Sequence, residues 1–275
     1  MVTRHAAVLG SPISHSLSPA LHLAAYRALR LSHWSYSAHE VQASALPGFV
    51  EGLGPNWAGL SLTMPLKEVA FEVADEVSDL AREVGAINTL VRRQDGGWKG
   101  DNTDVYGVTQ ALREAGHSHV ASAVVLGSGA TARSVVAALA TLGCAKVTFA
   151  VRSTARQETL DQARRAGLGV DVAGLGQLAD VLGGARVVVS SLPAKALTGG
   201  SLPQVSGCSD LLLLDVVYTG WPTPLARTFA EAGARVVSGL EMLVHQAAEQ
   251  VYLMTGLRPP VDQMRAAGLA AMGPQ

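Results

Sequence analysis

The sequence has few charged residues, few aromatic residues and very few cysteines. Charged side chains make up 16% of the 275 residues, and the formal net charge is −1 at pH 7. A chain with this balance lacks the basic surface by which proteins bind nucleic acids or anionic membranes, so we expect neither partner. The cysteines, Cys144 and Cys208, are too few for a disulfide framework or a thiolate metal site. We expect both to be buried, in a reducing compartment, with no metal bound.

Long apolar runs are also missing. No stretch approaches the ~20 apolar residues that a membrane-spanning helix needs. The N-terminus, MVTRH, lacks the apolar segment of a secretory signal peptide. We therefore expect a soluble protein of the cytoplasm. Hydrophobic residues nevertheless reach 48%, which is enough for the core of one large domain or of two modest ones.

The most informative stretch is residues 121–132, ASAVVLGSGATA. Its apolar run predicts a buried strand, and a helical pattern follows directly after Gly-x-Gly-x-x-Ala. Ordinary strand–helix turns also carry this pattern, but strand, glycine turn and helix in this order are what a dinucleotide-binding fingerprint requires. Gly127 permits the tight turn, Gly129 lets the backbone approach a pyrophosphate, and Ala132 lets the helix pack close to the strand. The helix N-terminus then offers free N–H groups to the phosphates.

The residues after the next predicted strand, 146–151, indicate which dinucleotide binds. Arg152 lies near the position, ~20 residues after the fingerprint, where NAD-binding sites carry an acidic residue. An arginine there accommodates the 2′-phosphate of NADP instead. We expect Arg156, one helical turn later, to reach the same phosphate, and Ser153 to donate a hydrogen bond to it. No carboxylate lies between positions 147 and 157, so the pattern favours NADP over NAD.

Predicted strands alternate with predicted helices along most of the chain, which indicates an α/β protein with a doubly wound parallel sheet. Apolar runs bounded by turn residues predict strands at 5–10, 34–38, 59–63, 121–126, 146–151, 185–190, 211–216 and 234–238. Helical patterns predict helices at 20–29, 43–53, 76–84, 101–115, 134–142, 152–166 and 240–252, with a hairpin over 85–100 and a short helix near the C-terminus.

Serines gather in the loop after the first predicted strand. Residues 11–18, SPISHSLS, hold four serines in eight positions. Ser18 followed by Pro19 predicts a helix N-cap and a proline in the first turn. The loop is either a plain capped helix start or a row of hydroxyls that holds a polyhydroxylated or carboxylate ligand at the end of a strand.

Two further strand ends carry polar residues. Thr63 and Lys67 flank Pro65 after the third predicted strand, at the edge where α/β folds bind ligands. Lys67 is either an ordinary surface charge or, among apolar neighbours, a group for proton transfer. Asp101 and Asp104 open a helix, where carboxylates favour the helix dipole, and we assign the capping role to Asp101.

Together these motifs resemble the shikimate dehydrogenase family, and the resemblance covers nearly the whole chain. The matching segments are 10–19 (GSPISHSLSP), 62–67 (LTMPLK), 85–89 (GAINT), 101–104 (DNTD) with Gly107, 127–132 (GSGATA), 152–153 (RS) with Arg156, 222–225 (PTPL) and 239–246 (GLEMLVHQ). Segments 23–29 (LAAYRAL) and 221–225 (WPTPL) resemble the actinobacterial members in particular.

The resemblance implies a two-domain protein. An N-terminal α/β domain, residues 1–105 together with 239–275, would bind substrate, and a Rossmann domain, residues 106–238, would bind NADPH. The implied reaction is the reversible reduction of 3-dehydroshikimate to shikimate, a step towards chorismate and the aromatic amino acids. The only implied partners are the small-molecule substrate and the cofactor. The sequence has no coiled-coil heptads and leaves monomer and homodimer open.

Matched position by position, the resemblance also implies roles for individual residues. Lys67 and Asp104 match the catalytic pair, with Lys67 as the general acid and base. The matched substrate-binding positions are Ser16 and Ser18 for the carboxylate, Tyr218 near it, and Thr63, Lys67, Asn88, Asp104 and Gln246 around the ring hydroxyls. The matched cofactor-binding positions are Gly127, Ser128, Gly129, Ala130, Thr131, Ala132, Arg152, Ser153, Arg156 and Gly239.

One departure from the family pattern bears on the cofactor. The family's usual asparagine before the arginine is replaced by Val151, so we expect weaker affinity for NADP and weaker discrimination against NAD. Alternative functions are a quinate/shikimate dehydrogenase that uses NAD, a non-catalytic relative that only binds ligand, and an enzyme for an amino analogue of shikimate. Arg152 and Arg156 argue against the first alternative, and intact Lys67 and Asp104 argue against the second.

Overall fold

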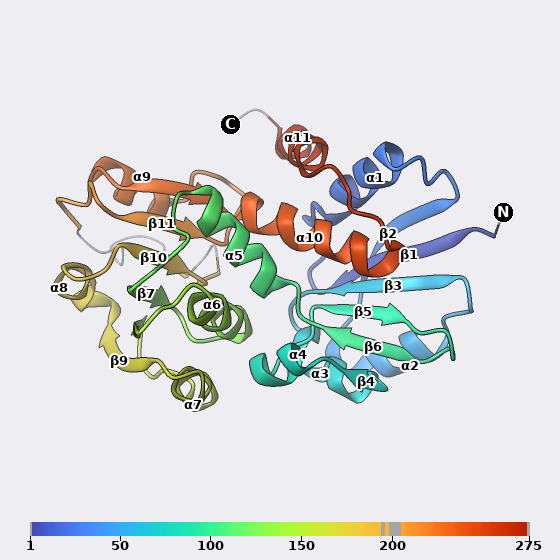
Figure 1. The fold of residues 1–275 in the computed structure, drawn as a ribbon, viewed down its shortest axis with the longest axis horizontal. Coiled ribbons are helices and arrows are strands. Elements are labelled where there is room, and N and C mark those ends of the chain that lie inside the picture. The colour runs from blue at the N-terminus through green and yellow to red at the C-terminus, as the bar shows by residue number, and fades with distance from the viewer. Residues whose placement is uncertain (1, 194–195, 198–204, 274–275) are drawn as a thin grey trace. The chain divides into compact units, whose positions relative to one another are not determined.

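The computed structural model describes residues 2–193, 196–197 and 205–273 (Figure 1). Its contacts divide the chain into two compact units. The first unit contains residues 1–106 and 243–274, and the second contains residues 107–242. The chain passes from one unit to the other inside two helices, α5 (Asp104–Glu114) and α10 (Gly239–Thr255). The first unit is therefore built from two separate segments of the chain, whereas the second is one continuous segment.

The first unit holds a mixed sheet with the strand order β2-β1-β3-β5-β6-β4. Its strands are β1 (Arg4–Gly10), β2 (Trp34–Glu40), β3 (Trp57–Leu62), β4 (Glu76–Val77), β5 (Thr89–Arg92) and β6 (Trp98–Asp101). Its helices are α1 (Ser18–Ala28), η1 (Ala43–Ala45), α2 (Leu46–Glu51), α3 (Leu66–Val69), η2 (Ala70–Glu72), α4 (Asp79–Val84) and α11 (Val261–Met272). β1 pairs in parallel with β2 and β3, and β5 pairs antiparallel with β3 and β6.

The core of the first unit joins the sheet to its short helices. Leu9, Leu60 and Leu62 come from the central strands, and Leu46 and Leu66 come from α2 and α3; each is at most 3% exposed. Burying a leucine side chain fully stabilises a fold by about 1.5–3 kcal/mol. This packing holds α3 against the end of β3 and so fixes the backbone of the short segment that carries the candidate catalytic lysine.

The second unit holds a parallel sheet with the strand order β12-β11-β10-β7-β8-β9. Its strands are β7 (Ser122–Leu126), β8 (Lys146–Val151), β9 (Gly169–Gly174), β10 (Val187–Ser190), β11 (Leu212–Asp215) and β12 (Arg235–Ser238). Its helices are α6 (Ala130–Thr141), α7 (Gln157–Arg165), η3 (Leu175–Gln177), α8 (Leu178–Leu182) and α9 (Pro224–Glu231). Counted from β7 as the first strand, this is the order of the doubly wound dinucleotide-binding fold. The predicted fold class is thus confirmed.

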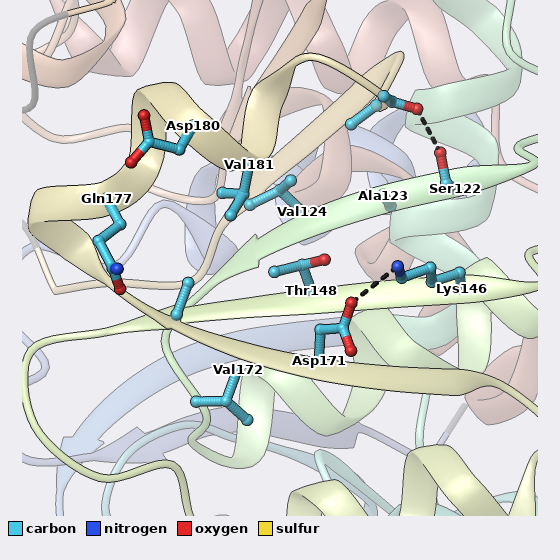
Figure 2. A pocket seen from close by; sticks show the side chains of 13 residues that line it. Ser122, Ala123, Val124, Lys146, Thr148, Asp171, Val172, Gln177, Asp180 and Val181 are labelled. Atoms are coloured by element: carbon cyan, nitrogen blue, oxygen red, sulfur yellow. Dashed lines mark hydrogen bonds and ion pairs between the residues drawn. The ribbon is translucent and has the colours of Figure 1, made fainter.

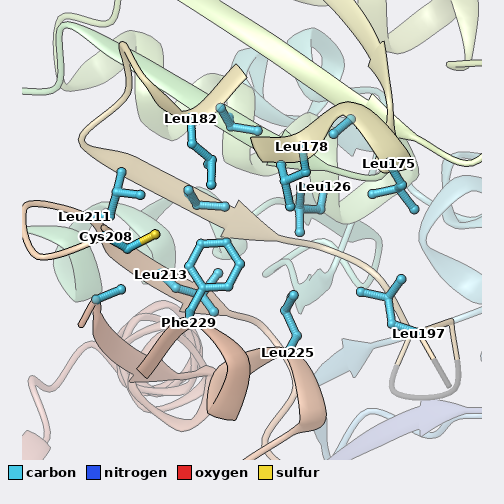
Figure 3. Packing of buried hydrophobic residues seen from close by; sticks show 14 residues of the cluster. Leu126, Leu175, Leu178, Leu182, Leu197, Cys208, Leu211, Leu213, Leu225 and Phe229 are labelled. Carbon is cyan, nitrogen blue, oxygen red and sulfur yellow. The ribbon is translucent and has the colours of Figure 1, made fainter. Parts of the chain in front are cut away.

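Figure 3 shows a buried cluster of the second unit. Phe229 and Leu225 of α9 pack with Leu213 of β11, while Leu178 and Leu182 reach the cluster from α8. Each of these side chains is at most 8% exposed. Because strands buried on both faces read as continuous apolar runs, the strand sequences SAVVL, VVVS and LLLD follow directly from this packing.

Some sequence-based predictions for the first unit are wrong. The helix predicted over 76–84 is split, because Glu76–Val77 forms β4 and pairs in parallel with β6. The helix proper starts after Ser78, whose side chain accepts a hydrogen bond from Ala81 N–H at 3.1 Å. Ser18, predicted as an N-cap, is instead the first residue of α1. Ser16 Oγ accepts a hydrogen bond from Ser18 N–H at 3.3 Å, at the point where the chain enters the helix.

In the second unit, β9 and α8 were not predicted. β9 reads GVDVAG and none of its residues is fully buried, so it gives only a weak apolar signal.

None of the helices in the described part of the chain combines the length and the apolar character needed to cross a bilayer. Both cysteines are free and buried as expected, and burial raises the pKa of the Cys144 and Cys208 thiols.

Candidate active site

A buried carboxylate, Asp104, organises the polar end of the first unit. Asp104 is the first residue of α5 and is 1% exposed. Its Oδ2 accepts a hydrogen bond from Lys67 Nζ at 2.5 Å, and its Oδ1 accepts one from Asn88 Nδ2 at 2.7 Å. Each carboxylate oxygen therefore has a donor, one of which carries a positive charge. Such charge-assisted pairs are stronger and better oriented than neutral hydrogen bonds.

The local fold brings Lys67 to this carboxylate. β3 ends at Leu62, and a cis peptide bond precedes Pro65 before α3 begins. Leu66 N–H donates to Thr63 O at 2.8 Å, and Ile87 N–H donates to Lys67 O at 2.8 Å. The backbone of the lysine is thus tied on two sides, while its side chain remains 14% exposed. The result is a lysine held in place yet still reachable from solvent.

Asn88, 1% exposed, connects the strands to the carboxylate. Its backbone carbonyl accepts from Leu62 N–H at 2.7 Å, and its backbone N–H donates to Asp101 O at 3.0 Å. Its side-chain Oδ1 accepts from Thr103 N–H at 2.8 Å, so its Nδ2 is the atom directed at Asp104. The capping role predicted for Asp101 is wrong. That residue ends β6, and its carboxylate accepts from Ser78 Oγ at 2.7 Å and from the N–H of the next residue.

The remaining predicted substrate residues of the first unit lie at two places. Gln246, on α10, approaches the same cluster, since its Oε1 lies 3.5 Å from Asn88 Nδ2. Thr63 lies beside the end of β1, where a Cβ added to Gly10 would come within 2.3 Å of its Cγ2. Ser16 and Ser18 follow β1 in the chain and contact each other through the hydrogen bond given above. The structure thus brings Lys67, Asn88, Asp104 and Gln246 into one hydrogen-bonded cluster.

The glycine turn of the second unit has the geometry that the fingerprint predicts. Gly127 adopts φ +97°, and its N–H donates to Ala150 O at 3.1 Å. Gly129 is the N-cap of α6, and a Cβ added there would meet no atom within 4 Å. Ala132 is fully buried. Open space above Gly129, together with Ala130 and Thr131 in the first turn of α6, leaves the helix N-terminus accessible to an anion.

The loop between β8 and α7 presents the predicted basic residues. Arg152, Ser153 and Arg156 are all exposed. Ser128, in the glycine turn, accepts a hydrogen bond from Arg156 N–H at 3.0 Å, so this turn and the arginine loop lie side by side. The predicted helical spacing of the two arginines is wrong, because α7 starts only at Gln157 and Arg156 is its extended N-cap. An extended backbone segment before α7, rather than a helical turn, brings the two arginines to the glycine turn.

Two further residues of the second unit, Tyr218 and Gly239, were predicted to contact the substrate and the cofactor. Tyr218 is half-buried in the loop after β11. Gly239 begins α10, and a Cβ added there would lie 2.0 Å from Val216 O. Close backbone packing therefore explains this glycine without any cofactor, and its predicted cofactor contact stays a prediction.

A cavity of about 520 Å³ opens elsewhere on the second unit (Figure 2). It is lined by the early residues of β7 and β8, including Ser122 and Lys146, and by β9 and α8. An ion pair of 2.7 Å between Lys146 and Asp171 lies in its wall. Doubly wound folds bind dinucleotides at the carboxyl ends of their strands, and this cavity lies towards the amino ends of β7 and β8. We therefore assign it no role in cofactor binding.

Sequence reasoning missed several polar residues behind the cluster. Thr89 donates to Asn88 Oδ1 at 2.8 Å, and Gln250 Nε2 donates to Thr89 Oγ1 at 3.0 Å. Thr103 Oγ1 accepts from Asn88 Nδ2 at 3.0 Å. The sequence did offer one signal for Gln250: it follows Gln246 by one helical turn, in a mostly apolar helix.

Comparison with known proteins gives three family matches. Residues 8–90 match the shikimate dehydrogenase substrate binding domain, residues 109–208 match shikimate/quinate 5-dehydrogenase, and residues 239–267 match the shikimate 5′-dehydrogenase C-terminal domain. The curated shikimate dehydrogenase (NADP(+)) of Sinorhizobium fredii is 36% identical over 267 residues, which covers 94% of this chain and 92% of that protein.

Two solved structures are similar over nearly the whole chain. The shikimate dehydrogenase of Mycobacterium tuberculosis is 44% identical with a TM-score of 0.87, and the match covers 97% of this chain and 99% of that one. The shikimate 5-dehydrogenase of Thermus thermophilus, solved in complex with NADP(H) and shikimate, is 33% identical with a TM-score of 0.82 and coverage of 98% and 100%. The first of these agrees with the resemblance to actinobacterial enzymes.

Proposed function

The chain belongs to the shikimate dehydrogenase family, and from this premise we propose that it reduces 3-dehydroshikimate reversibly to shikimate with NADPH, using Lys67 as the proton donor. The observation that supports the catalytic assignment is the Lys67–Asp104 pair of 2.5 Å at the end of β3, in which the carboxylate is buried and the lysine is partly exposed. The curated relative and the Thermus complex support the substrate and the cofactor.

Ketone reduction adds a hydride to the carbonyl carbon and a proton to its oxygen. NADPH, when bound, supplies the hydride. Lys67 as an ammonium donates the proton and stabilises negative charge growing on the oxygen. In the reverse direction the neutral amine accepts the hydroxyl proton. An ammonium group has three N–H donors, and within the described part of the chain Asp104 uses one, which leaves donors for a substrate oxygen.

Asp104 has a positioning and a binding role in this proposal. Its carboxylate fixes the direction of the Lys67 amine, and it can accept a hydrogen bond from a substrate hydroxyl beside its two protein donors. Asn88 and Gln246 lie at the same cluster, and Thr63, Ser16 and Ser18 follow neighbouring strand ends. Hydroxyl and amide groups of this kind suit a polyhydroxylated carboxylate.

The residues of the second unit fit NADP. Gly129 leaves the first turn of α6 open, so the pyrophosphate would be held at free N–H groups. Arg152 and Arg156, both exposed beside the turn, would hold the 2′-phosphate, and guanidinium groups bind phosphates through paired hydrogen bonds. Ser153 and Ser128 add hydroxyl groups in the same place. Val151 is buried at the end of β8 and offers no polar atom from its side chain to the cofactor.

The first experiment measures initial rates of shikimate and quinate oxidation, each with NADP and with NAD. Fast turnover with shikimate and NADP alone supports the proposal. Comparable rates with NAD would mean that the cofactor site does not select the 2′-phosphate. Faster turnover of quinate would identify the NAD-dependent quinate alternative, and no turnover with any pair would contradict the proposed reaction.

A lysine variant then tests the catalytic role. We expect Lys67→Met to lower kcat by ~10²–10⁴ with a modest change in KM, because a positioned acid–base group typically contributes that factor. Lys99→Met is the matched control, since Lys99 lies in the same unit, is 44% exposed and pairs with Glu76 at 2.9 Å. The control should keep the wild-type kcat. An unchanged kcat in Lys67→Met would remove this residue from the mechanism.

We also propose that the protein acts in the cytoplasm, as a monomer or a homodimer. Two free, buried cysteines are in keeping with a reducing compartment. Sedimentation equilibrium over a range of protein concentrations distinguishes the two assembly states, and fractionation of cells that express the native protein tests its location.

A further inference from the structure

A chain of buried hydrogen bonds leads away from the catalytic cluster into the first unit. Tyr36 Oη donates to Ser61 Oγ at 2.6 Å, and Ser61 Oγ donates to Gln250 Oε1 at 2.8 Å. Gln250 Nε2 donates in turn to Thr89 Oγ1 at 3.0 Å. Three strands and α10 thus contribute to one polar line.

The line continues to the carboxylate. Thr89 Oγ1 donates to Asn88 Oδ1 at 2.8 Å, and Asn88 Nδ2 donates to Asp104 Oδ1 at 2.7 Å. The exposed fraction is 6% or less for every member, namely Tyr36, Ser61, Gln250, Thr89, Asn88 and Asp104. Water therefore does not compete for these bonds.

Every donor in the line is directed towards Asp104. A hydroxyl group has a single proton, and Thr89 gives it to Asn88 Oδ1, the same oxygen that accepts from Thr103 N–H at 2.8 Å, so both donors favour the amide orientation that directs Nδ2 at the carboxylate. Gln250 is fixed in the same way, since its Oε1 accepts from Ser61 and its Nε2 donates to Thr89. Hydrogen bonds aligned head to tail also polarise and strengthen one another.

We propose that Tyr36 and Thr89 are positioning residues for the reaction, acting through this line on Asn88 and Asp104. The proposal rests on the catalytic role given above to Lys67 and Asp104. With the line intact, the Asn88 amide holds one carboxylate oxygen while Lys67 occupies the other. With the line broken, Asn88 Oδ1 keeps the Thr103 N–H but loses the Thr89 hydroxyl, so the amide that holds the carboxylate is fixed by one donor fewer.

The far end of the line is itself anchored. The ring of Tyr36 stacks on His22 with centroids 3.9 Å apart and an interplanar angle of 16°. The His22 ring is held in turn by Ser18, whose backbone oxygen accepts a hydrogen bond from His22 Nδ1 at 2.9 Å. Tyr36 is therefore connected through His22 to a serine proposed to bind the substrate carboxylate and, through the line, to the residues proposed to act on the carbonyl.

The first test compares two substitutions at Thr89 in the full-length protein. Thr89→Val keeps the shape of the side chain and removes the hydroxyl, and we expect kcat/KM to fall roughly 5- to 50-fold, because Asn88 Oδ1 loses one of its buried donors and Gln250 Nε2 loses the Thr89 oxygen as an acceptor. Thr89→Ser keeps the hydroxyl and should restore activity to within about threefold of wild type. If Thr89 only filled space, Thr89→Ser would not restore activity, because serine lacks the methyl group that makes the packing contacts.

The second test acts at the far end. Tyr36→Phe should lower kcat/KM by roughly 3- to 10-fold, since the defect reaches Asp104 only through four intermediate residues. Tyr26→Phe is the matched control: Tyr26 is 2% exposed in the same aromatic cluster, and within the described residues its hydroxyl has no hydrogen-bond partner. The control should keep wild-type kinetics.

A double variant tests whether Thr89 and Tyr36 act through one line or independently of each other. Once Thr89→Val has cut the line, adding Tyr36→Phe should lower kcat/KM by less than twofold more, because coupled residues are not additive. Wild-type kinetics in both Thr89→Val and Tyr36→Phe, failed recovery in Thr89→Ser, or fully additive losses would each overturn the proposal. If Thr89→Val does not fold, Tyr36→Phe against Tyr26→Phe still decides it. Absence of activity in the wild-type protein would instead refute the proposed function.

Discussion

Acid should destabilise the first unit through one buried histidine, His22. It lies on α1 with 0% exposure, and its Nδ1 donates to Ser18 O at 2.9 Å. Desolvation by burial lowers the pKa of His22 from 6.5 to about 4, and the hydrogen bond to Ser18 opposes this only in part. The neighbouring tyrosines do not titrate in this range, because burial raises the pKa of both Tyr26 and Tyr36.

The sign of the effect follows from proton binding. The unfolded chain takes up a proton at His22 below about pH 6.5, whereas the folded protein does so only near pH 4. The contribution of neutral His22 to stability is therefore complete above pH 6.5 and is lost as pH falls towards 4. One unit of pKa corresponds to about 1.4 kcal/mol, so the full loss is about 3 kcal/mol, of which about 2 kcal/mol has gone by about pH 5.

The assay is urea denaturation of wild type and His22→Phe at about pH 7.5 and about pH 5. Phenylalanine keeps a ring against Tyr36 and cannot titrate. Trp34 reports on this region, since its ring centroid lies 5.4 Å from that of Tyr26, so tryptophan fluorescence follows the transition. Other titrating groups are shared by the two proteins and cancel in the difference. The variant should lose about 2 kcal/mol less than wild type between the two pH values, and equal losses would refute the argument.

Three further outcomes are expected. Arg152→Ala should raise KM for NADP roughly 10- to 100-fold and leave KM for NAD within about twofold, because a charge-assisted phosphate contact is lost; equal changes for both cofactors would contradict its assignment. Gly127→Ala should lower the free energy of unfolding by about 1–2 kcal/mol, since φ is +97° and the new Cβ would lie 2.8 Å from Ser191 Oγ. Thr223→Val should destabilise the second unit by about 1–3 kcal/mol, because the helix cap on Ala226 N–H and the 2.7 Å bond to Asp215 both disappear, and a melting temperature equal to wild type would show the cap to be dispensable.

Local signals in the sequence were sufficient for the glycine turn and the central strands of the second unit, though not for β9 and α8. The strand, glycine turn and helix around Gly127 lie next to one another in the chain, and their order alone predicts the geometry that is found. Thr-Pro at positions 223–224 is another such local signal, since it is typical of a helix start and the structure has Thr223 as the N-cap of α9. β8 matches its predicted bounds because its apolar run is interrupted at both ends.

The first unit needed information that no local pattern contains. Lys67 and Asp104 are 37 residues apart, and only the family resemblance paired them before the structure did. Ser61 and Gln250 are 189 residues apart, and nothing in either sequence neighbourhood predicts their hydrogen bond. β4 exists because β6 offers it a partner, and a two-residue strand has no period of its own.

The division of the first unit into two chain segments sets an order of assembly. During synthesis, residues 107–242 are complete before the rest of α10, from residue 243 onward, emerges, so the second unit can fold while the first still lacks Gln246 and Gln250. Closing the first unit around an unfolded insertion would restrict a long flexible loop, whereas a folded insertion leaves little loop entropy to lose. Assembly of the polar line from Tyr36 to Asp104 then follows the folding of the second unit, so the newly made chain acquires its doubly wound fold before it can complete the cluster around Asp104.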